Sequence, residues 1–310
     1  MRRLTSLLSL LLLLLSAPAL AQQEWREMEY ADLNGVRIAY DEVGSGEPIL
    51  FVHGGQVADS FLPMLSEPSL EGYRRISMHV RGNGQSGDSE EPFTYQVAAA
   101  DGLELLRHLG ISEAHVVAHS SSGRVALYMA MAAPDLVQSL VLLEGRAPDV
   151  EGLSRMDRRE QYAEDNPDAD DLEGPFAAER PDRTREDRAA FWLEMTLGPE
   201  WQDVIADVYP HAQEHLIRAY GRTRPGDGQR DPSITNPRVA EADYANIGSP
   251  IMYIASEAMH PAMQTVIDFL KERFPDTIVE VAGETHMLQV LHPAAAAQTI
   301  RDFVSQHPID

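Results

Sequence analysis

Residues 114–127 read AHVVAHSSSGRVAL, and this stretch decides the fold. An apolar run of strand type ends at Ser120 and passes without a loop into RVALYM, a pattern typical of a helix. The order predicts a strand, one sharp turn and a helix, with the small residues Ala118 and Ser122 two positions before and after Ser120. Such a turn raises the serine hydroxyl above the sheet edge, close to unpaired helical N–H groups. A small-residue turn without chemistry is the alternative interpretation.

The N-terminus has the form of a targeting segment. It reads MRRLTSLLSLLLLLLSAPALA, in which two arginines precede a leucine-rich run and Ala19-Leu20-Ala21 has the small-x-small form of a cleavage site. This pattern predicts a signal peptide over residues 1–21, and the apolar run is too short for a transmembrane span. We therefore expect an exported protein, periplasmic or secreted if the source is bacterial, without a membrane segment in the mature form. An uncleaved anchor is the alternative.

The composition excludes several kinds of site and partner. The 310 residues contain no cysteine, so disulfides, thiol nucleophiles and Cys-based metal sites are excluded. The formal net charge of -24 repels nucleic acid and anionic membranes, and we expect neither as a partner. The partner that we expect is a small-molecule substrate. The sequence carries no signal for the oligomeric state.

Strand and helix patterns alternate along much of the chain. Asn34-Gly35 predicts a hairpin turn between two strands in residues 26–43. Further strands are expected at 49–52, 73–79, 114–119, 139–143, 251–255 and 277–281, and helices at 95–109, 262–274 and 293–304, besides the helix after Ser120. This alternation predicts a mostly parallel sheet with helices on both faces and a ligand site beyond the carboxyl ends of the strands.

The alternation stops between Pro148 and Asp243. An acid-rich stretch there precedes helical patterns at 191–197 and 201–220. We interpret residues 148–243 as a helical cap inserted into a core that is formed by residues 22–147 and 244–310. Candidates for substrate contacts are Gln56, beside a glycine loop, and the cap aromatics Phe191, Trp192, Trp201 and Tyr209. Packing of these aromatics among the cap helices is the alternative.

Four motifs together resemble the α/β-hydrolase family. Residues 53–55, HGG, are similar to its oxyanion loop, and AHSSSG is similar to its nucleophile elbow. RGNGQS at 81–86 resembles the loop usually written Asp-x-Arg-Gly-x-Gly-x-Ser, although His79 replaces the aspartate. EVAGETHMLQVLHP is similar to the loop that carries the catalytic histidine. The resemblance implies the α/β-hydrolase fold with an inserted cap, Ser120 as nucleophile and His286 as base.

The chemistry of serine leads to the same residues. A serine hydroxyl needs a base within hydrogen-bond reach, and histidine is the usual choice. Among the eleven histidines we favour His286, because its loop follows the last strand at the sheet edge of Ser120, and we expect positioning or packing roles for His53 and His119. The backbone N–H groups of Gly55 and Ser121 are the expected oxyanion donors. The histidines form no HExxH pattern, so we expect no catalytic metal and no cofactor.

A serine nucleophile indicates acyl transfer. Family relatives that open epoxides or remove halides attack with aspartate, whose ester can be hydrolysed, whereas a serine ether could not be turned over. We therefore expect a serine hydrolase of a small carboxylic ester or lactone. A C–C bond hydrolase of the same fold is the alternative enzyme, and a binding protein without catalysis is the alternative from another class.

The acid that orients His286 is the point at which the chain departs from the family. Its usual place is a Gly-x-x-Asp arrangement after strand 251–255, but Met259 stands where the aspartate is expected. Glu144 follows strand 139–143 directly, and it resembles the acid that some haloalkane dehalogenases carry there. We predict Glu144 as the acid, because an acidic residue that ends an apolar strand beneath a cap is costly without a partner. Glu257 is the alternative acid, and no acid at all is the third possibility.

Overall fold

The computed structural model describes most of the core and part of the predicted cap. The described residues are 27–55, 57–148, 150, 184–208, 212–214, 217, 237–259 and 263–309. The predicted signal peptide, Gln56, Tyr209 and the side chain of Trp192 lie outside them. The division into core and cap therefore stays a prediction.

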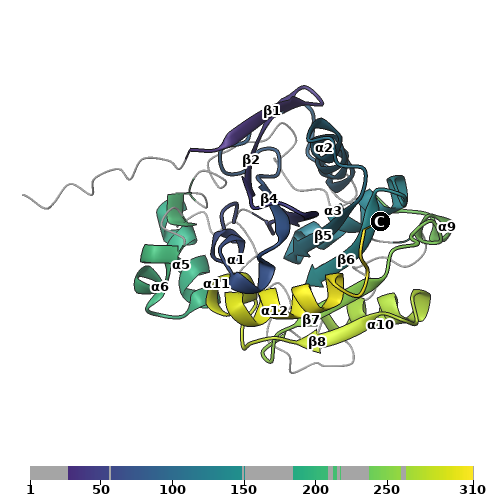
Figure 1. Cartoon of the computed structure of the whole chain (residues 1–310). Coiled ribbons are helices and arrows are strands. Elements are labelled where there is room, and N and C mark those ends of the chain that lie inside the picture. Colours follow the sequence, from purple (N-terminus) through teal and green to yellow (C-terminus); the bar gives the residue numbers. More distant parts are fainter. Residues whose placement is uncertain are drawn as a thin grey trace, which may run out of the picture.

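Eight strands form one mixed sheet (Figure 1). They are β1 (Glu29–Leu33), β2 (Val36–Val43), β3 (Glu47–Val52), β4 (Tyr73–Met78), β5 (Ala114–His119), β6 (Val137–Leu143), β7 (Ile251–Ala255) and β8 (Ile278–Val281), in the order β1-β2-β4-β3-β5-β6-β7-β8. β2 pairs antiparallel with β1 and β4, and every other pair is parallel. The predicted hairpin turn is present, since Asn34 and Gly35 both have positive φ. The expected mostly parallel sheet is confirmed.

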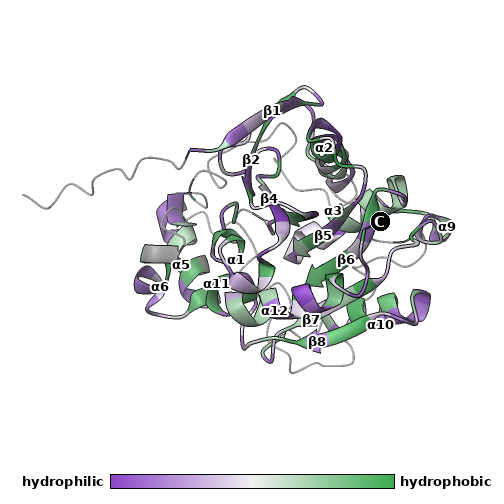
Figure 2. Cartoon of the chain, viewed as in Figure 1, coloured by the Kyte–Doolittle hydropathy of each residue, from purple (hydrophilic) through white to green (hydrophobic). Residues whose placement is uncertain are grey.

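Helices cover both faces of this sheet. The described helices are α1 (Leu62–Leu65), α2 (Tyr95–His108), α3 (Gly123–Ala132), α5 (Arg185–Leu197), α6 (Trp201–Val208), α9 (Glu241–Tyr244), α10 (Gln264–Arg273), α11 (Leu288–Leu291) and α12 (Pro293–Val304), with 3-10 turns η1 (Pro68–Leu70) and η2 (Ser120–Ser122). One apolar cluster joins the sheet to α2, α3, α9 and α10, and a second joins it to α1, α11 and α12. Figure 2 shows the apolar residues gathered where these layers meet.

Strand β5 lies at the centre of the sheet, between β3 and β6. All six of its residues are buried, which explains why its apolar residues do not alternate with exposed polar ones. Val116 packs into the cluster below α2 and α3, while Val117 packs into the cluster on the opposite face. Because the strand is fixed on both faces, the residue that follows it, Ser120, has a firmly defined position at the carboxyl edge.

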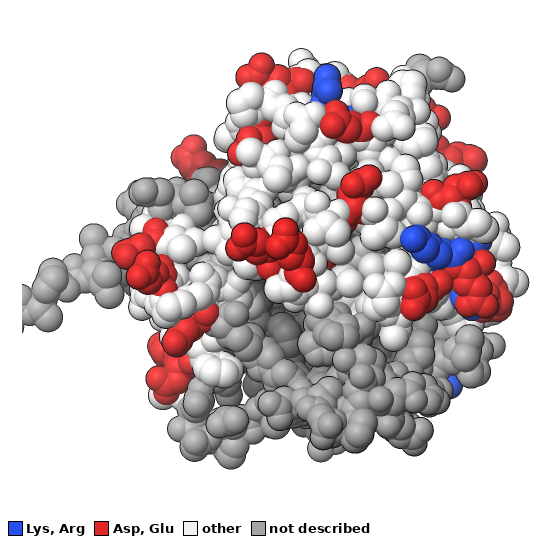
Figure 3. Space-filling model, turned by 90° about the horizontal axis from the view of Figure 1, so that it is seen from below, with Lys and Arg blue, Asp and Glu red and all other residues white. Residues whose placement is uncertain are grey.

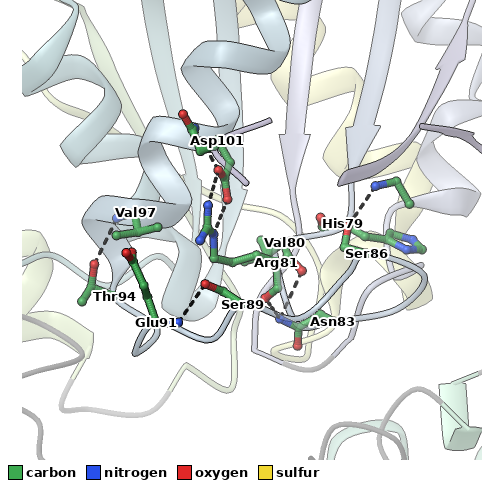
Figure 4. Close-up of polar contacts among 12 residues, drawn as sticks. His79, Val80, Arg81, Asn83, Ser86, Ser89, Glu91, Thr94, Val97 and Asp101 are labelled. Atoms are coloured by element: carbon green, nitrogen blue, oxygen red, sulfur yellow. Dashed lines mark hydrogen bonds and ion pairs between the residues drawn. The ribbon is translucent and has the colours of Figure 1, made fainter. Parts of the chain in front are cut away.

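The loop after β4 is fixed by a buried ion pair (Figure 4). The guanidinium of Arg81 donates two hydrogen bonds to the carboxylate of Asp101 on α2, at 2.5 and 2.6 Å. Asn34 donates a third bond to the same carboxylate at 3.0 Å, and this ties the β1–β2 turn to the pair. The bidentate geometry explains the need for arginine in the RGNGQS motif.

Breaking this pair is expected to destabilise the fold. Asp101→Asn leaves a buried guanidinium without its counter-charge, and we expect the free energy of unfolding to fall by about 3 kcal/mol. Urea unfolding followed by circular dichroism measures the loss. Glu104→Gln on the same helix is the control, because its ion pair with Arg107 is exposed and its loss should change stability by less than about 0.5 kcal/mol. Equal effects of the two changes would contradict a structural role for the buried pair.

The surface is strongly acidic. Figure 3 shows acidic side chains spread over the face seen from below, with few basic ones among them. This agrees with the formal net charge of -24 for the whole chain. Among the described helices, none combines the length and the hydropathy that crossing a bilayer requires.

Candidate active site

Ser120 stands on a strained turn between β5 and α3. Its φ is 50°, a left-handed conformation that is uncommon for residues other than glycine. The Ser120 carbonyl accepts a hydrogen bond from the Arg146 N–H at 2.9 Å, so the loop after β6 holds the turn. A Cβ on Gly123 would lie 2.6 Å from the backbone N and O of Arg146. Gly123 must therefore be small, in addition to the buried Ser122, whose hydroxyl donates to the His53 carbonyl at 2.5 Å.

The HGG loop after β3 lies directly against this turn. A Cβ on Gly54 would be 2.6 Å from His119 Nδ1 and 3.0 Å from Ser120 Cβ, so only glycine fits. A Cβ on Gly55 would lie 3.3 Å from Ser121 Oγ. The structure thus brings together Gly55 and Ser121, the two residues whose N–H groups are the expected oxyanion donors.

Two buried histidines support the HGG loop. His53 accepts a hydrogen bond at Nε2 from the Val80 N–H at 2.9 Å, and its Nδ1–H donates to the Gly54 carbonyl at 2.6 Å. Burial, together with the nearby His79, lowers the pKa of His53 to about 3, so its ring is neutral near pH 7. His79 Nε2 lies 2.8 Å from the Asp59 carboxylate. Where the family motif has an aspartate, this chain therefore has a histidine that is paired with a carboxylate from another loop.

His286 is paired with Glu144. Its Nδ1 lies 2.5 Å from Glu144 Oε2, and because the carboxylate can only accept, the ring donates from Nδ1. Nε2 is then left as the proton acceptor. The Glu144 side chain is 3% exposed and that of His286 29%, so a buried carboxylate holds an imidazole that solvent reaches. Glu144 has φ 41°, and its N–H donates to the Ile254 carbonyl on the neighbouring strand, which directs its side chain at the end of β6.

Ser256, the first residue after β7, holds the other oxygen of Glu144. Its backbone N–H donates to Glu144 Oε1 at 2.9 Å, and its hydroxyl donates to the same oxygen. Burial alone would raise the pKa of Glu144, but the bonds and charge of His286 and the bonds of Ser256 outweigh it, so the pKa is lowered. Glu257 is exposed, and its N–H pairs with the Gly283 carbonyl. Within the described part of the chain, the carboxylate that contacts His286 is that of Glu144 and not that of Glu257.

His119, the residue before Ser120, connects the turn to the loop of His286. Its Nε2–H donates to the His286 carbonyl at 2.9 Å, and the two rings lie 4.6 Å apart between centroids. Burial, and then the charge of His286, lower the pKa of His119 to about 3, so this neighbour stays neutral when His286 gains a proton. This contact holds the loop of His286 against His119, the residue adjacent to Ser120 in the chain. The sequence indicated only a positioning or packing role for His119 and gave no sign of its partner.

The Ser256 bonds give a testable pH dependence of stability. The pKa of Glu144 is depressed in the folded protein. Its ionised form therefore adds to the free energy of unfolding above pH 4.5, the pKa of a free glutamate, and this stabilisation is lost as pH falls through the folded pKa. Ser256→Ala removes one donor and should raise that pKa, so the variant should lose more stability at pH 7 than at pH 3.5, measured by urea unfolding. Ser249→Ala, before β7, is the control, because the Ser249 hydroxyl donates to the uncharged Val137 carbonyl. Its loss should lower the free energy of unfolding equally at both pH values. A pH-independent loss in Ser256→Ala would contradict the assigned role.

Helices α5 and α6, which lie within the predicted cap, pack against residues that adjoin the loops of the site. Trp201 of α6 is buried in a cluster with Val57, near the HGG loop, and with Met287, next to His286. Residues of α5 belong to the same cluster. Phe191 of α5, by contrast, is exposed. The structure therefore shows Trp201 as a packing residue in this cluster, and its predicted substrate contact stays a prediction.

The arrangement gathers the predicted site residues Ser120, His286 and Glu144, together with the Gly55 and Ser121 backbone, at the carboxyl edge of the sheet. Among the described residues, no group of three or more histidine, aspartate or glutamate side chains is placed to hold a metal ion. The donors at the site are suited to moving a proton between oxygen and nitrogen atoms and to stabilising an oxyanion.

A known protein family matches most of the chain. The family model described as alpha/beta hydrolase fold matches residues 47–293. A dihydrolipoyllysine-residue acetyltransferase component of the acetoin cleaving system, from Cupriavidus necator, is 35% identical over 117 residues, which are 37% of this chain and 31% of that protein. A soluble epoxide hydrolase from Corynebacterium sp. is 35% identical over 121 residues, 37% of this chain and 40% of that protein.

A solved structure resembles the chain over a longer range. A thermophilic esterase from Thermogutta terrifontis superposes with a TM-score of 0.64 at 19% identity, covering 91% of this chain and 100% of that one. At this identity the likeness shows the fold. The matched part of the chain spans less than half of the length of the two sequence relatives, so their activities are not carried over with the match.

Proposed function

The chain belongs to the alpha/beta hydrolase fold family, and from this premise we propose that it is a serine hydrolase of small carboxylic esters or lactones. The observation that carries the proposal is the pairing of His286 with Glu144, in a loop that is bonded to His119, the residue before Ser120 and its left-handed turn. Residues in strained backbone conformations cluster at functional sites, where the surrounding structure holds them in place. A purely structural serine turn would have no need of a buried, correctly oriented His–Glu pair.

The nucleophile selects the bond class. Attack by Ser120 Oγ on an ester carbonyl carbon gives a tetrahedral oxyanion, and the N–H groups of Gly55 and Ser121 would stabilise it. Collapse of this intermediate breaks the ester C–O bond and leaves an acyl-enzyme, which water can hydrolyse. A serine that opened an epoxide would instead form a stable ether. The likeness to a soluble epoxide hydrolase therefore extends to the fold and not, in our proposal, to the reaction.

His286 moves the proton in both halves of the proposed reaction. Nε2 takes the proton of Ser120 during attack and gives it to the leaving alkoxide. It then takes a proton from the water that attacks the acyl-enzyme and returns it to Ser120 Oγ as the carboxylic acid leaves. Glu144 keeps Nδ1 protonated and stabilises the imidazolium that forms twice per cycle. Because Ser256 holds Oε1 of Glu144, Oε2 stays directed at the ring.

A substrate comparison tests this assignment. We expect the protein to hydrolyse p-nitrophenyl acetate and butyrate, and to be at least about a hundredfold slower, in kcat/KM, on a vinylogous diketone that reports C–C cleavage. Faster cleavage of the diketone would replace ester hydrolysis by C–C hydrolysis. Absence of turnover of every substrate, with tight binding of one of them, would indicate a binding protein.

A further inference from the structure

The loop that carries Gly55, the expected oxyanion donor, is fastened on both sides of that residue. Before Gly55, the ring of His53 accepts a hydrogen bond at Nε2 from the Val80 N–H at 2.9 Å. After it, the carboxylate of Asp59 accepts a hydrogen bond from His79 Nε2 at 2.8 Å. The three side chains that form these bonds are buried, none of them more than 3% exposed. Two adjacent residues of the loop after β4 therefore hold both ends of this loop.

The bond to His53 fixes the orientation of the Gly54–Gly55 peptide. Because a backbone N–H can only donate, Nε2 of His53 is the acceptor and Nδ1 carries the hydrogen. Nδ1 donates this hydrogen to the Gly54 carbonyl at 2.6 Å. The peptide is planar and trans, so the Gly55 N–H is directed away from the His53 ring. The direction of the oxyanion donor therefore depends on where Val80 holds that ring.

His79 is held firmly enough to serve as an anchor. Its Nδ1 accepts from the Gln85 N–H at 3.0 Å, so Nε2 carries the hydrogen that Asp59 accepts. Its backbone carbonyl accepts from the Ser86 hydroxyl at 2.6 Å, and its backbone N–H donates to the Ala39 carbonyl at 2.9 Å. All four polar groups of His79 are thus bonded, and the Asp59 carboxylate meets a donor in a defined position.

This pair explains why the chain departs from the family motif at position 79. An aspartate there would face the buried carboxylate of Asp59, and two like charges so close together repel each other. Histidine supplies the N–H donor that a carboxylate lacks. His79 and Asp59 therefore depend on each other, and the loop that they fasten is the one that holds Gly55.

Resting on the proposed function, we propose that Asp59 and His79 are positioning residues of the reaction, which hold the HGG loop so that the Gly55 N–H meets the oxyanion. They act through the loop and not by contact with substrate. Displacement of a donor by about 1 Å weakens its bond to the transition state, while binding of the ground state persists. The rival role is stabilisation of the fold without any effect on the oxyanion.

Variants of Asp59 that keep or remove the acceptor test the proposal. Asp59→Asn keeps an oxygen for the His79 N–H, whereas Asp59→Leu has a similar shape and no acceptor. We expect Asp59→Leu to lower kcat for p-nitrophenyl butyrate by about tenfold to a hundredfold with little change in KM, and Asp59→Asn to stay within about threefold of wild type. His79→Asn carries the same test if the leucine variant does not fold, because its side chain can accept from the Gln85 N–H but is too short to reach Asp59.

A transition-state analogue gives a readout that a change in stability alone does not move. Ser120 Oγ adds to the carbonyl carbon of an alkyl trifluoromethyl ketone, its proton passes to His286, and the carbonyl oxygen becomes an oxyanion. In Asp59→Leu the inhibition constant of this ketone should rise by the factor by which kcat/KM falls. Ser139→Ala is the control, because it breaks a buried 2.7 Å bond to His115 Nδ1 at the amino ends of β5 and β6. It should lower stability and leave kcat and the inhibition constant unchanged.

The outcomes separate the positioning role from the proposed function. Unchanged kcat and inhibition constant in folded Asp59→Leu would overturn the positioning role, and so would an equal loss in Asp59→Asn or in Ser139→Ala. Ser120-dependent ester hydrolysis by wild-type protein would then leave the proposed function intact. If wild-type protein neither hydrolyses an ester nor binds the ketone, the proposed function fails, and the positioning role fails with it.

Discussion

Ser120→Ala is expected to lower kcat for p-nitrophenyl butyrate by about 10⁶-fold, the size of loss that follows removal of a serine nucleophile. The alanine has no oxygen to form the acyl-enzyme, while the HGG loop and the N–H donors stay in place. The variant should therefore still bind substrate, and its residual turnover should exceed the rate of uncatalysed ester hydrolysis in water. Stopped-flow assays of the wild-type protein and long-time assays of the variant together cover this range of turnover rates.

The Ser120 prediction has a control in the same chain. Ser305→Ala, at the end of α12, removes a hydroxyl that donates to the Asp302 carbonyl far from the site in sequence, and it should keep nearly full activity. Retention of more than about a hundredth of the wild-type kcat in Ser120→Ala would show that the elbow serine is not the nucleophile.

Glu144→Gln is expected to lower kcat by about 10⁴-fold with little change in folding, because an amide can hold the wrong histidine tautomer and gives no charge to stabilise the imidazolium. The substitution keeps the size of the side chain. KM should change little, since no contact with substrate is lost. Steady-state kinetics and thermal unfolding on the same samples separate the catalytic loss from a folding loss.

Glu257→Gln is the matched control for Glu144→Gln. Glu257 lies one residue beyond Ser256, nearer to the usual position of the family acid, but it is exposed. We expect this variant to keep nearly full activity. A large loss of activity in Glu257→Gln, together with retained activity in Glu144→Gln, would contradict the assignment of Glu144 as the acid. It would place the partner of His286 after β7.

Much of the fold could be predicted because its signals are local. The apolar run of β5, the Asn34-Gly35 turn and the pattern of α12 each occupy a continuous stretch, and the structure has all three. α10 begins at Gln264, two residues later than its pattern suggested. The four-residue helices α1, α9 and α11 were not predicted, since four residues are too few to show a helical period.

The parts of the site that the sequence did not reveal depend on contacts between distant residues. Ser256 meets Glu144 across 112 positions, and His119 meets the His286 carbonyl across 167. The first contact follows from the pairing of the neighbouring strands β6 and β7, and the second from the path of the loop after β8, and no single segment contains either. Glu144 could be proposed because an acid that ends a buried strand is unusual by itself. Asp59, which supplies a carboxylate to His79, carries no such local sign.

The central claim is that Ser120 is activated by His286 and Glu144 as a nucleophile. Incubation with a fluorophosphonate, followed by peptide mass spectrometry, tests it directly, because the reagent phosphonylates a serine only when a base activates it. The account predicts one adduct, on Ser120, which is absent in Ser120→Ala and forms much more slowly in Glu144→Gln. An adduct on another residue, or no adduct on folded wild-type protein, would contradict it.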